Sequence, residues 1–90
     1  MQLRGIVMSA TLDENPPDSG IVEMTIRVQG VGAGQPRRIV LPFAILIQDE
    51  TLEPESIQGH GFLAEVVEGS DKRWHVVEIV FAQGRVLRNE

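Results

Sequence analysis

The segment IVEMTIRVQ, residues Ile21–Gln29, decides the fold class. Apolar side chains stand at every second position from Val22 to Val28, and polar side chains fill the positions between them. An alternation with period two is typical of a β-strand that has one buried face and one exposed face. We therefore predict a half-buried strand here, with Arg27 on its outward face.

Turn-forming sequences on both sides of this strand separate it from two further runs of strand character. DENPPDSG, residues 13–20, ends a first run from Gln2 to about Leu12, because two prolines and a glycine exclude regular structure there. GVGAGQP, residues 30–36, leads into RRIVLPF, residues 37–43, and the two strands joined by a glycine-rich loop predict a hairpin. The expected inward side chains of this third strand are Ile39, Leu41 and Phe43.

The second half of the chain predicts another hairpin. Gly59–Gly69 and Trp74–Ala82 are both rich in apolar and β-branched residues, and the charged sequence SDKR lies between them. Residues 44–58 allow a short helix at most, because acidic residues and Pro54 interrupt them. The expected inward side chains of the last strand are Val77, Ile79 and Phe81.

The fold class that follows is all-β, with five short strands in one domain covering residues 1–90. Five strands with open edges would tend to pair with other chains, and closure into a small barrel removes those edges. We expect a five-stranded Greek-key barrel in which the helix between strands 3 and 4 is short or absent. An SH3-like barrel is the alternative.

Composition limits the function classes. The chain has no cysteine, which excludes disulfides and thiolate metal sites, and it has 13 acidic against 8 basic residues, for a net charge of -5. We found no catalytic motif, no metal-ligand spacing around His60 and His75, and no cofactor motif, so we expect neither an enzyme nor a cofactor. No apolar run approaches the ~20 residues of a membrane span. We expect a cytoplasmic protein.

The order of the elements resembles that of the bacterial single-stranded-DNA-binding protein family, including the primosomal replication proteins. The resemblance rests on Gly5 in LRGIV, on the turn PDSG, residues 17–20, before the alternating strand, and on the basic start of RRIVL, residues 37–41. The closing hairpin, residues 59–87, is also similar. The resemblance implies an OB-fold that binds single-stranded nucleic acid and forms dimers or tetramers.

Single-strand binding requires cations for the phosphates and aromatic faces for the bases. In the family that the chain resembles, the loops between strands 2 and 3 and between strands 4 and 5 flank the binding face. Four phosphate contacts, from the two basic pairs in these loops, would give a salt slope near −3 at ~0.7 per contact. The expected partner is single-stranded DNA or RNA, and the expected contact residues are Arg27, Arg37, Arg38, Lys72, Arg73 and Trp74.

Apolar residues at outward positions of the last two strands indicate a second buried surface. They predict a homo-oligomer whose interface contains Leu63, Val67, Val76 and Val80. An alternative function is a protein-interaction or assembly module that has lost nucleic-acid binding. The acidic balance favours this alternative, as does Gln35-Pro36-Arg37 at a point where the resembled family usually has an aromatic residue.

Overall fold

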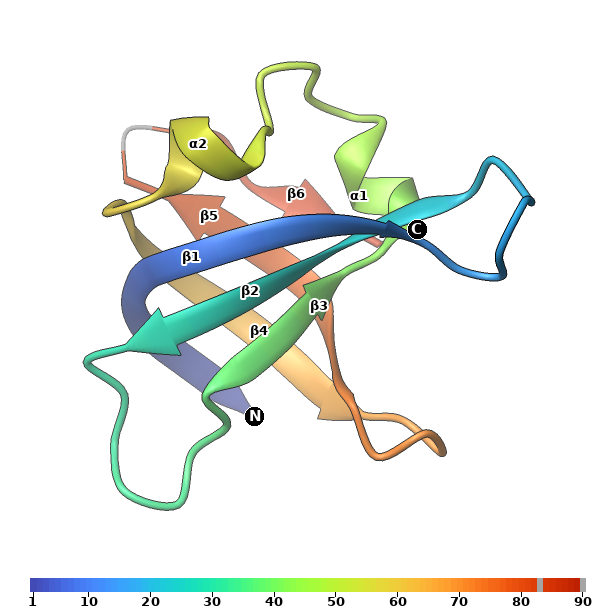
Figure 1. Ribbon diagram of the computed structural model, residues 1–90. Helices are drawn as coiled ribbons and strands as arrows, with labels where there is room; N and C mark the ends of the chain where they lie inside the picture. The colour runs from blue at the N-terminus through green and yellow to red at the C-terminus, as the bar shows by residue number, and fades with distance from the viewer. Residues whose placement is uncertain (83, 90) are drawn as a thin grey trace.

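β-strands are the main secondary structure of the chain, which the computed structural model describes at residues 1–82 and 84–89 (Figure 1). The predicted all-β class is confirmed, because the described helices are two single turns between the third and fourth strands. A sixth strand of two residues follows the five that the sequence predicted. The strands are β1 (Gln2–Glu14), β2 (Val22–Gln29), β3 (Arg38–Leu41), β4 (Gly61–Glu68), β5 (Trp74–Phe81) and β6 (Leu87–Arg88), and the helices are α1 (Phe43–Leu46) and α2 (Pro54–Ile57).

The six strands form one sheet that closes into a ring. Along the sheet the order is β3, β2, β1, β4, β5 and β6, and neighbouring strands are antiparallel. A parallel pairing between Val40 of β3 and His75 of β5 joins the two sides of the sheet. The ring therefore has an inner surface, which forms the core, and an outer surface, which presents the polar residues of each strand.

β1 belongs to two pairings, and a glycine makes this geometry accessible. Residues 2–6 of β1 pair with β4, and residues 6–14 pair with β2. A Cβ atom on Gly5 would lie 2.8 Å from the carbonyl oxygen of Gln29 and 3.0 Å from a side-chain carbon of Val31. Because these distances are too short for a side chain, only glycine lets the end of β2 approach β1 here.

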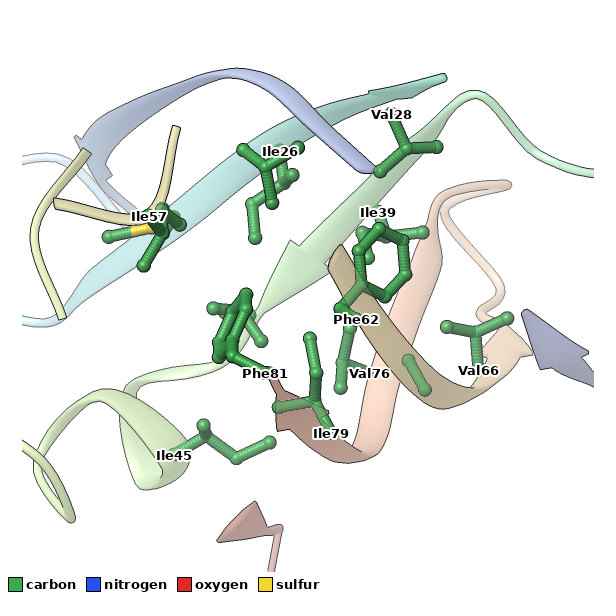
Figure 2. Packing of buried hydrophobic residues seen from close by; sticks show 14 of the residues in the cluster. Ile26, Val28, Ile39, Ile45, Ile57, Phe62, Val66, Val76, Ile79 and Phe81 are labelled. Atoms are coloured by element: carbon green, nitrogen blue, oxygen red, sulfur yellow. The ribbon is translucent and has the colours of Figure 1, made fainter. Parts of the chain in front are cut away.

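The core contains residues from all six strands and from both helices. On β2 the predicted alternation is confirmed from Met24 to Val28, since Met24, Ile26 and Val28 are buried. Val22, expected to face the same interior, is only half-buried and lies outside the core cluster, because it pairs with the last residue of β1 at the end of the sheet. The buried cluster (Figure 2) consists of Leu3, Val7, Met24, Ile26, Val28, Ile39, Leu41, Ile45, Ile57, Phe62, Ala64, Val66, Val76, Ile79, Phe81 and Leu87.

A β-bulge in β5 changes the predicted orientations of two neighbouring residues. Val76 is in the core, and Val77, which was expected to face inward with Ile79 and Phe81, is only half-buried and lies outside the core cluster. Glu65 pairs with Glu78 and Val66 pairs with Val76, so Val77 has no partner on β4. The extra residue changes the alternation, and the Val76 side chain lies in the core with those of Phe62 and Ile79 (Figure 2). The prediction that Val76 faces outward into an oligomer interface is therefore wrong.

The third strand is shorter than the sequence indicated. Ile39 and Leu41 are buried as expected, but β3 ends at Leu41 and Pro42 precedes the first turn of α1. Phe43 belongs to that turn, so its side chain is 37% exposed instead of sharing the inward face of the strand. Across residues 1–82 and 84–89, no helix has the length and apolarity needed to cross a membrane.

Candidate nucleic-acid interface

The six residues predicted to contact nucleic acid all line one hollow on the outer surface of the ring. The hollow has a volume of about 640 Å³. Its floor is the outer face of β2 and β3, and its walls are the β2–β3 loop and the β4–β5 loop, which Figure 1 shows at the same end of the molecule. The lining residues are Thr25, Arg27, Pro36, Arg37, Arg38, Val40, Lys72, Arg73 and Trp74.

The hollow concentrates positive charge on an acidic protein. Five of the eight basic residues of the chain line it, and none of its lining residues is acidic. Cations gathered in a concave surface produce a local potential whose sign can differ from that of the net charge. The net charge of -5 therefore does not describe this part of the surface.

Two of these cations are paired on neighbouring strands. Arg27 of β2 and Arg38 of β3 are directly opposed in the antiparallel register, and both are exposed. Like charges in this position destabilise a sheet by roughly 0.2–1 kcal/mol. In the described part of the chain neither arginine forms an ion pair that would offset the repulsion. A bound anion would relieve it.

Arg73 differs from the other cations of the hollow because two carboxylates hold it. Its Nη1 donates to Oε1 of Glu23 at 2.6 Å, and its Nε donates to Oδ2 of Asp71 at 3.0 Å. Hydrogen bonds to Glu23 first and then to Asp71 raise the pKa of Arg73 above its usual value. The cations that remain available to a ligand are Arg27, Arg37, Arg38 and Lys72.

Asp71 fixes the shape of the β4–β5 loop. Its carboxylate accepts the backbone N–H of Arg73 at 3.0 Å and lies 3.0 Å from Nε2 of His75. These hydrogen bonds, with the backbone N–H of Arg73 contributing most, hold the pKa of Asp71 well below the usual aspartate range. Hydrogen bonds of Asp71 with Arg73 and His75 therefore fix the loop that carries Lys72 and Arg73.

Glu23 connects this loop to a second one. Besides its contact with Arg73, Oε1 of Glu23 accepts a hydrogen bond from Nδ2 of Asn15 at 3.3 Å, and Asn15 lies in the loop between β1 and β2. Neither Glu23 nor Asp71 was predicted from the sequence. Alternation along β2 does put Glu23 on the same face as Arg27, but nothing in the sequence pairs it with a residue 50 positions away.

Trp74 is the aromatic residue of the hollow. It is the first residue of β5, it is half-buried, and part of its side chain packs against the core. Trp74 also lines the hollow beside the cations. An aromatic ring anchored in this way offers a base a rigid surface at little entropic cost, and base–aromatic stacking is worth about 1–3 kcal/mol.

The residues predicted for an oligomer interface are not all brought together. Leu63 and Val80 are directly opposed on β4 and β5 and line a common groove on the outer surface. Val67 is exposed near the end of β4, opposite His75 and outside that groove, and Val76 is in the core. Only Leu63 and Val80 therefore remain candidates for one continuous surface.

Among the described residues, no three histidine, aspartate or glutamate side chains come together as they would around a metal ion. No protein-family model, curated protein or solved structure matches the chain. A function for this chain therefore has to be inferred from the geometry of the hollow.

Proposed function

We propose that this protein is a non-enzymatic module that binds single-stranded nucleic acid, DNA or RNA, in the hollow between β2, β3 and the β4–β5 loop. The observation behind the proposal is the gathering of five cations and a tryptophan around one concave surface with no acidic lining residue. The opposed pair of Arg27 and Arg38 adds weight, because the sheet accepts a repulsion there that an anionic ligand would remove.

The strand connections support an OB-fold as the finer class of this ring. The circuit β1, β2, β3, β5, β4 and back to β1, with short helices between β3 and β4, agrees with a five-stranded Greek-key OB-fold barrel to which β6 is added. OB-folds bind oligonucleotides on the face of strands 2 and 3 with the loops between strands 1 and 2 and between strands 4 and 5. The hollow lies over β2 and β3 and is bounded by the β4–β5 loop, which agrees with part of that arrangement.

The chemistry of the hollow suits a single strand better than a duplex. A single strand exposes its bases, so phosphates can contact the free cations while a base stacks on Trp74. Four available cations at ~0.7 released counterions each predict a salt slope of about −3. A slope of this size corresponds to moderate binding that weakens strongly as salt rises.

Fluorescence of Trp74, the only tryptophan, gives a direct test. The protein is titrated at low salt with an oligothymidine, with a duplex of equal length, and with heparin as a polyanion that has no bases. We expect saturable quenching by the oligothymidine, weaker binding of the duplex, and no comparable quenching by heparin. Unchanged emission at micromolar protein and low salt, with the fold intact, would contradict the proposal.

The competing function is a protein-interaction module built on the same ring. It is supported by the net charge of -5 and by the position before Arg37, where Pro36 stands instead of an aromatic residue. It predicts a stable oligomer with no affinity for any of the oligonucleotides. The same titration therefore decides between the two functions.

A further inference from the structure

A second, smaller hollow continues the candidate nucleic-acid interface onto the outer face of β1. It has a volume of about 220 Å³, and we call it the β1 hollow. Thr25, Arg27 and Arg38 line both hollows, so the two form one surface that runs over β3, β2 and β1. The β1 hollow is lined by Ser9, Ala10, Thr11, Asp13, Thr25, Arg27 and Arg38.

The strand register explains why the polar side chains of the β1 hollow share one face of the sheet. Ser9 of β1 is opposite Arg27 of β2, and Thr11 is opposite Thr25. Opposed residues project from the same side of a sheet, as do residues two positions apart along one strand. Asp13, two positions after Thr11, therefore continues the same outward row on β1.

The chemistry of the lining changes along this continuous surface. Near the β4–β5 loop it consists of cations and an indole, whereas on β1 it consists of the hydroxyls of Ser9 and Thr11 and the carboxylate of Asp13. A carboxylate repels phosphate and only accepts hydrogen bonds, while a hydroxyl both donates and accepts them. The β1 end of the surface is therefore suited to the polar edge of a base and not to the phosphate backbone.

Asp13 has a charge that the fold leaves uncompensated. It is directly opposite Glu23 in the register, and Glu23 is paired with Arg73. Across residues 1–82 and 84–89, Asp13 itself forms no ion pair. Like charges directly opposed on neighbouring strands destabilise a sheet. Hydrogen-bond donors supplied to Asp13 by a ligand would offset this repulsion.

We infer that the β1 hollow binds a guanine base of the single strand held in the larger hollow, an inference that rests on the proposed function. Bases of single strands are read through hydrogen bonds on their Watson–Crick edges. Guanine presents two adjacent donors there, N1–H and the N2 amino group, beside the acceptor O6. The two carboxylate oxygens of Asp13 accept from these donors, and the hydroxyl of Thr11 donates to O6.

The other bases match this set of groups less well. Adenine and cytosine each present one amino donor next to a ring nitrogen that is an acceptor, and this acceptor would face the carboxylate of Asp13. The N–H donor of thymine lies between two carbonyl oxygens, which the carboxylate repels. A carboxylate beside hydroxyls therefore favours guanine over the three other bases.

The spacing of the strands lets one oligonucleotide occupy both hollows. β5, which carries Trp74, pairs with β3, and β3 is followed by β2 and β1. Three strand spacings amount to about 14 Å, which about four stacked nucleotides span at roughly 3.4 Å each. A base stacked on Trp74 and a guanine at Asp13 can therefore belong to the same strand, with Arg27 and Arg38 between them to contact the phosphates.

Association constants measured through Trp74 fluorescence test the inference with two oligonucleotides of equal length, an oligothymidine and an alternating thymidine–guanosine strand. We expect the guanine-containing strand to bind at least about fivefold more tightly, as a bidentate contact to a base requires. Hypoxanthine in place of guanine lacks the N2 amino group, so it should lose most of this preference.

Asp13→Asn should abolish the preference, because an amide has one acceptor oxygen and its amino group opposes the donors of guanine. The matched control is Asp18→Asn, which makes the same change of charge at an exposed residue that lines neither hollow. The control should keep the guanine preference. The two variants should bind the oligothymidine equally.

The outcomes separate this inference from the proposed function. Equal binding of the two oligonucleotides by the natural sequence, or a guanine preference that survives Asp13→Asn, would overturn the inference and leave the proposed function standing. A preference for RNA over DNA that is the same for every base would also overturn it, because a ribose hydroxyl would then be the group that is recognised. No binding of any oligonucleotide would refute the proposed function and the inference with it.

Discussion

The guanidinium of Arg73 lies 2.6 Å from the carboxylate of Glu23, although the two residues are 50 positions apart in the sequence. The contact attaches the β4–β5 loop to the outer face of β2, where Glu23 also accepts a hydrogen bond from Asn15. The β1–β2 loop, the β4–β5 loop and strand β2 therefore meet at one carboxylate. The same contact occupies one of the five cations that line the hollow.

Replacing Glu23 by glutamine should free the two terminal nitrogens of Arg73 for a ligand, while its Nε stays bonded to Asp71. We expect tighter binding of an oligothymidine and a salt slope steeper by ~0.7, because one more cation becomes available to a phosphate. The free energy of unfolding should fall by no more than about 1 kcal/mol, since the ion pair is partly exposed. Titrations at several salt concentrations and urea unfolding measure the two effects.

Glu50→Gln is the control for that variant, because it changes the net charge equally at an exposed residue that does not line the hollow. It should leave the salt slope unchanged. Equal slopes for Glu23→Gln and Glu50→Gln would show that Arg73 is not withheld from the ligand by Glu23.

Removing one arginine of the opposed pair should improve stability and weaken binding. Arg38→Ala relieves the repulsion with Arg27, so we expect the free energy of unfolding to rise by roughly 0.2–1 kcal/mol. The same change should lower oligonucleotide affinity and reduce the salt slope by ~0.7. Arg38→Lys keeps the charge and should keep the slope. Unaltered affinity in Arg38→Ala would remove this residue from the contact set.

The bulge in β5 can be tested with two neighbouring substitutions. Val76→Thr should destabilise the fold by about 1–3 kcal/mol, because it introduces a hydroxyl into a fully buried position. Val77→Thr should cost much less, since Val77 is partly exposed and has no partner on β4. Urea unfolding measures both, and the opposite order of stabilities would restore the uninterrupted alternation that the sequence suggested.

The lowered pKa of Asp71 predicts a dependence of stability on pH with a definite sign. A carboxylate whose pKa is depressed in the folded state stabilises the fold fully above its ordinary value of about 3.9, and the contribution is lost as pH falls toward the lowered value. Asp71→Asn should therefore destabilise the protein at neutral pH, and the difference from the natural sequence should disappear in strong acid. A difference that stays constant down to strong acid would argue against the hydrogen bonds of Asp71 as its source.

The alternation from Met24 to Val28 was sufficient to predict β2 and its buried face, because a strand with one exposed face has a period of two in its sequence. The same reasoning failed on β5, where apolar residues occupy consecutive positions from Val76 to Val77 and the sequence does not indicate which of them is the bulge. Alternation alone then assigned Val76 to the wrong side.

The members of the candidate site were predictable, but their relationships were not. Arg37, Arg38, Lys72 and Arg73 stand in two loops that the turn signals located, and the closed ring brings these loops together. The ion pair of Arg73 with Glu23 joins side chains 50 positions apart, and no pattern in the sequence indicates it. For that reason the sequence predicted Arg73 as a contact residue on the same footing as Arg27, although the guanidinium of Arg73 is bonded to two carboxylates.

The salt dependence of oligothymidine affinity, followed by Trp74 fluorescence, tests the central claim most directly. The logarithm of the association constant plotted against the logarithm of the salt concentration should fall with a slope of about −3, as four available cations require. A slope near zero, or no measurable binding at low salt, would contradict the assignment of the hollow as a single-strand binding site.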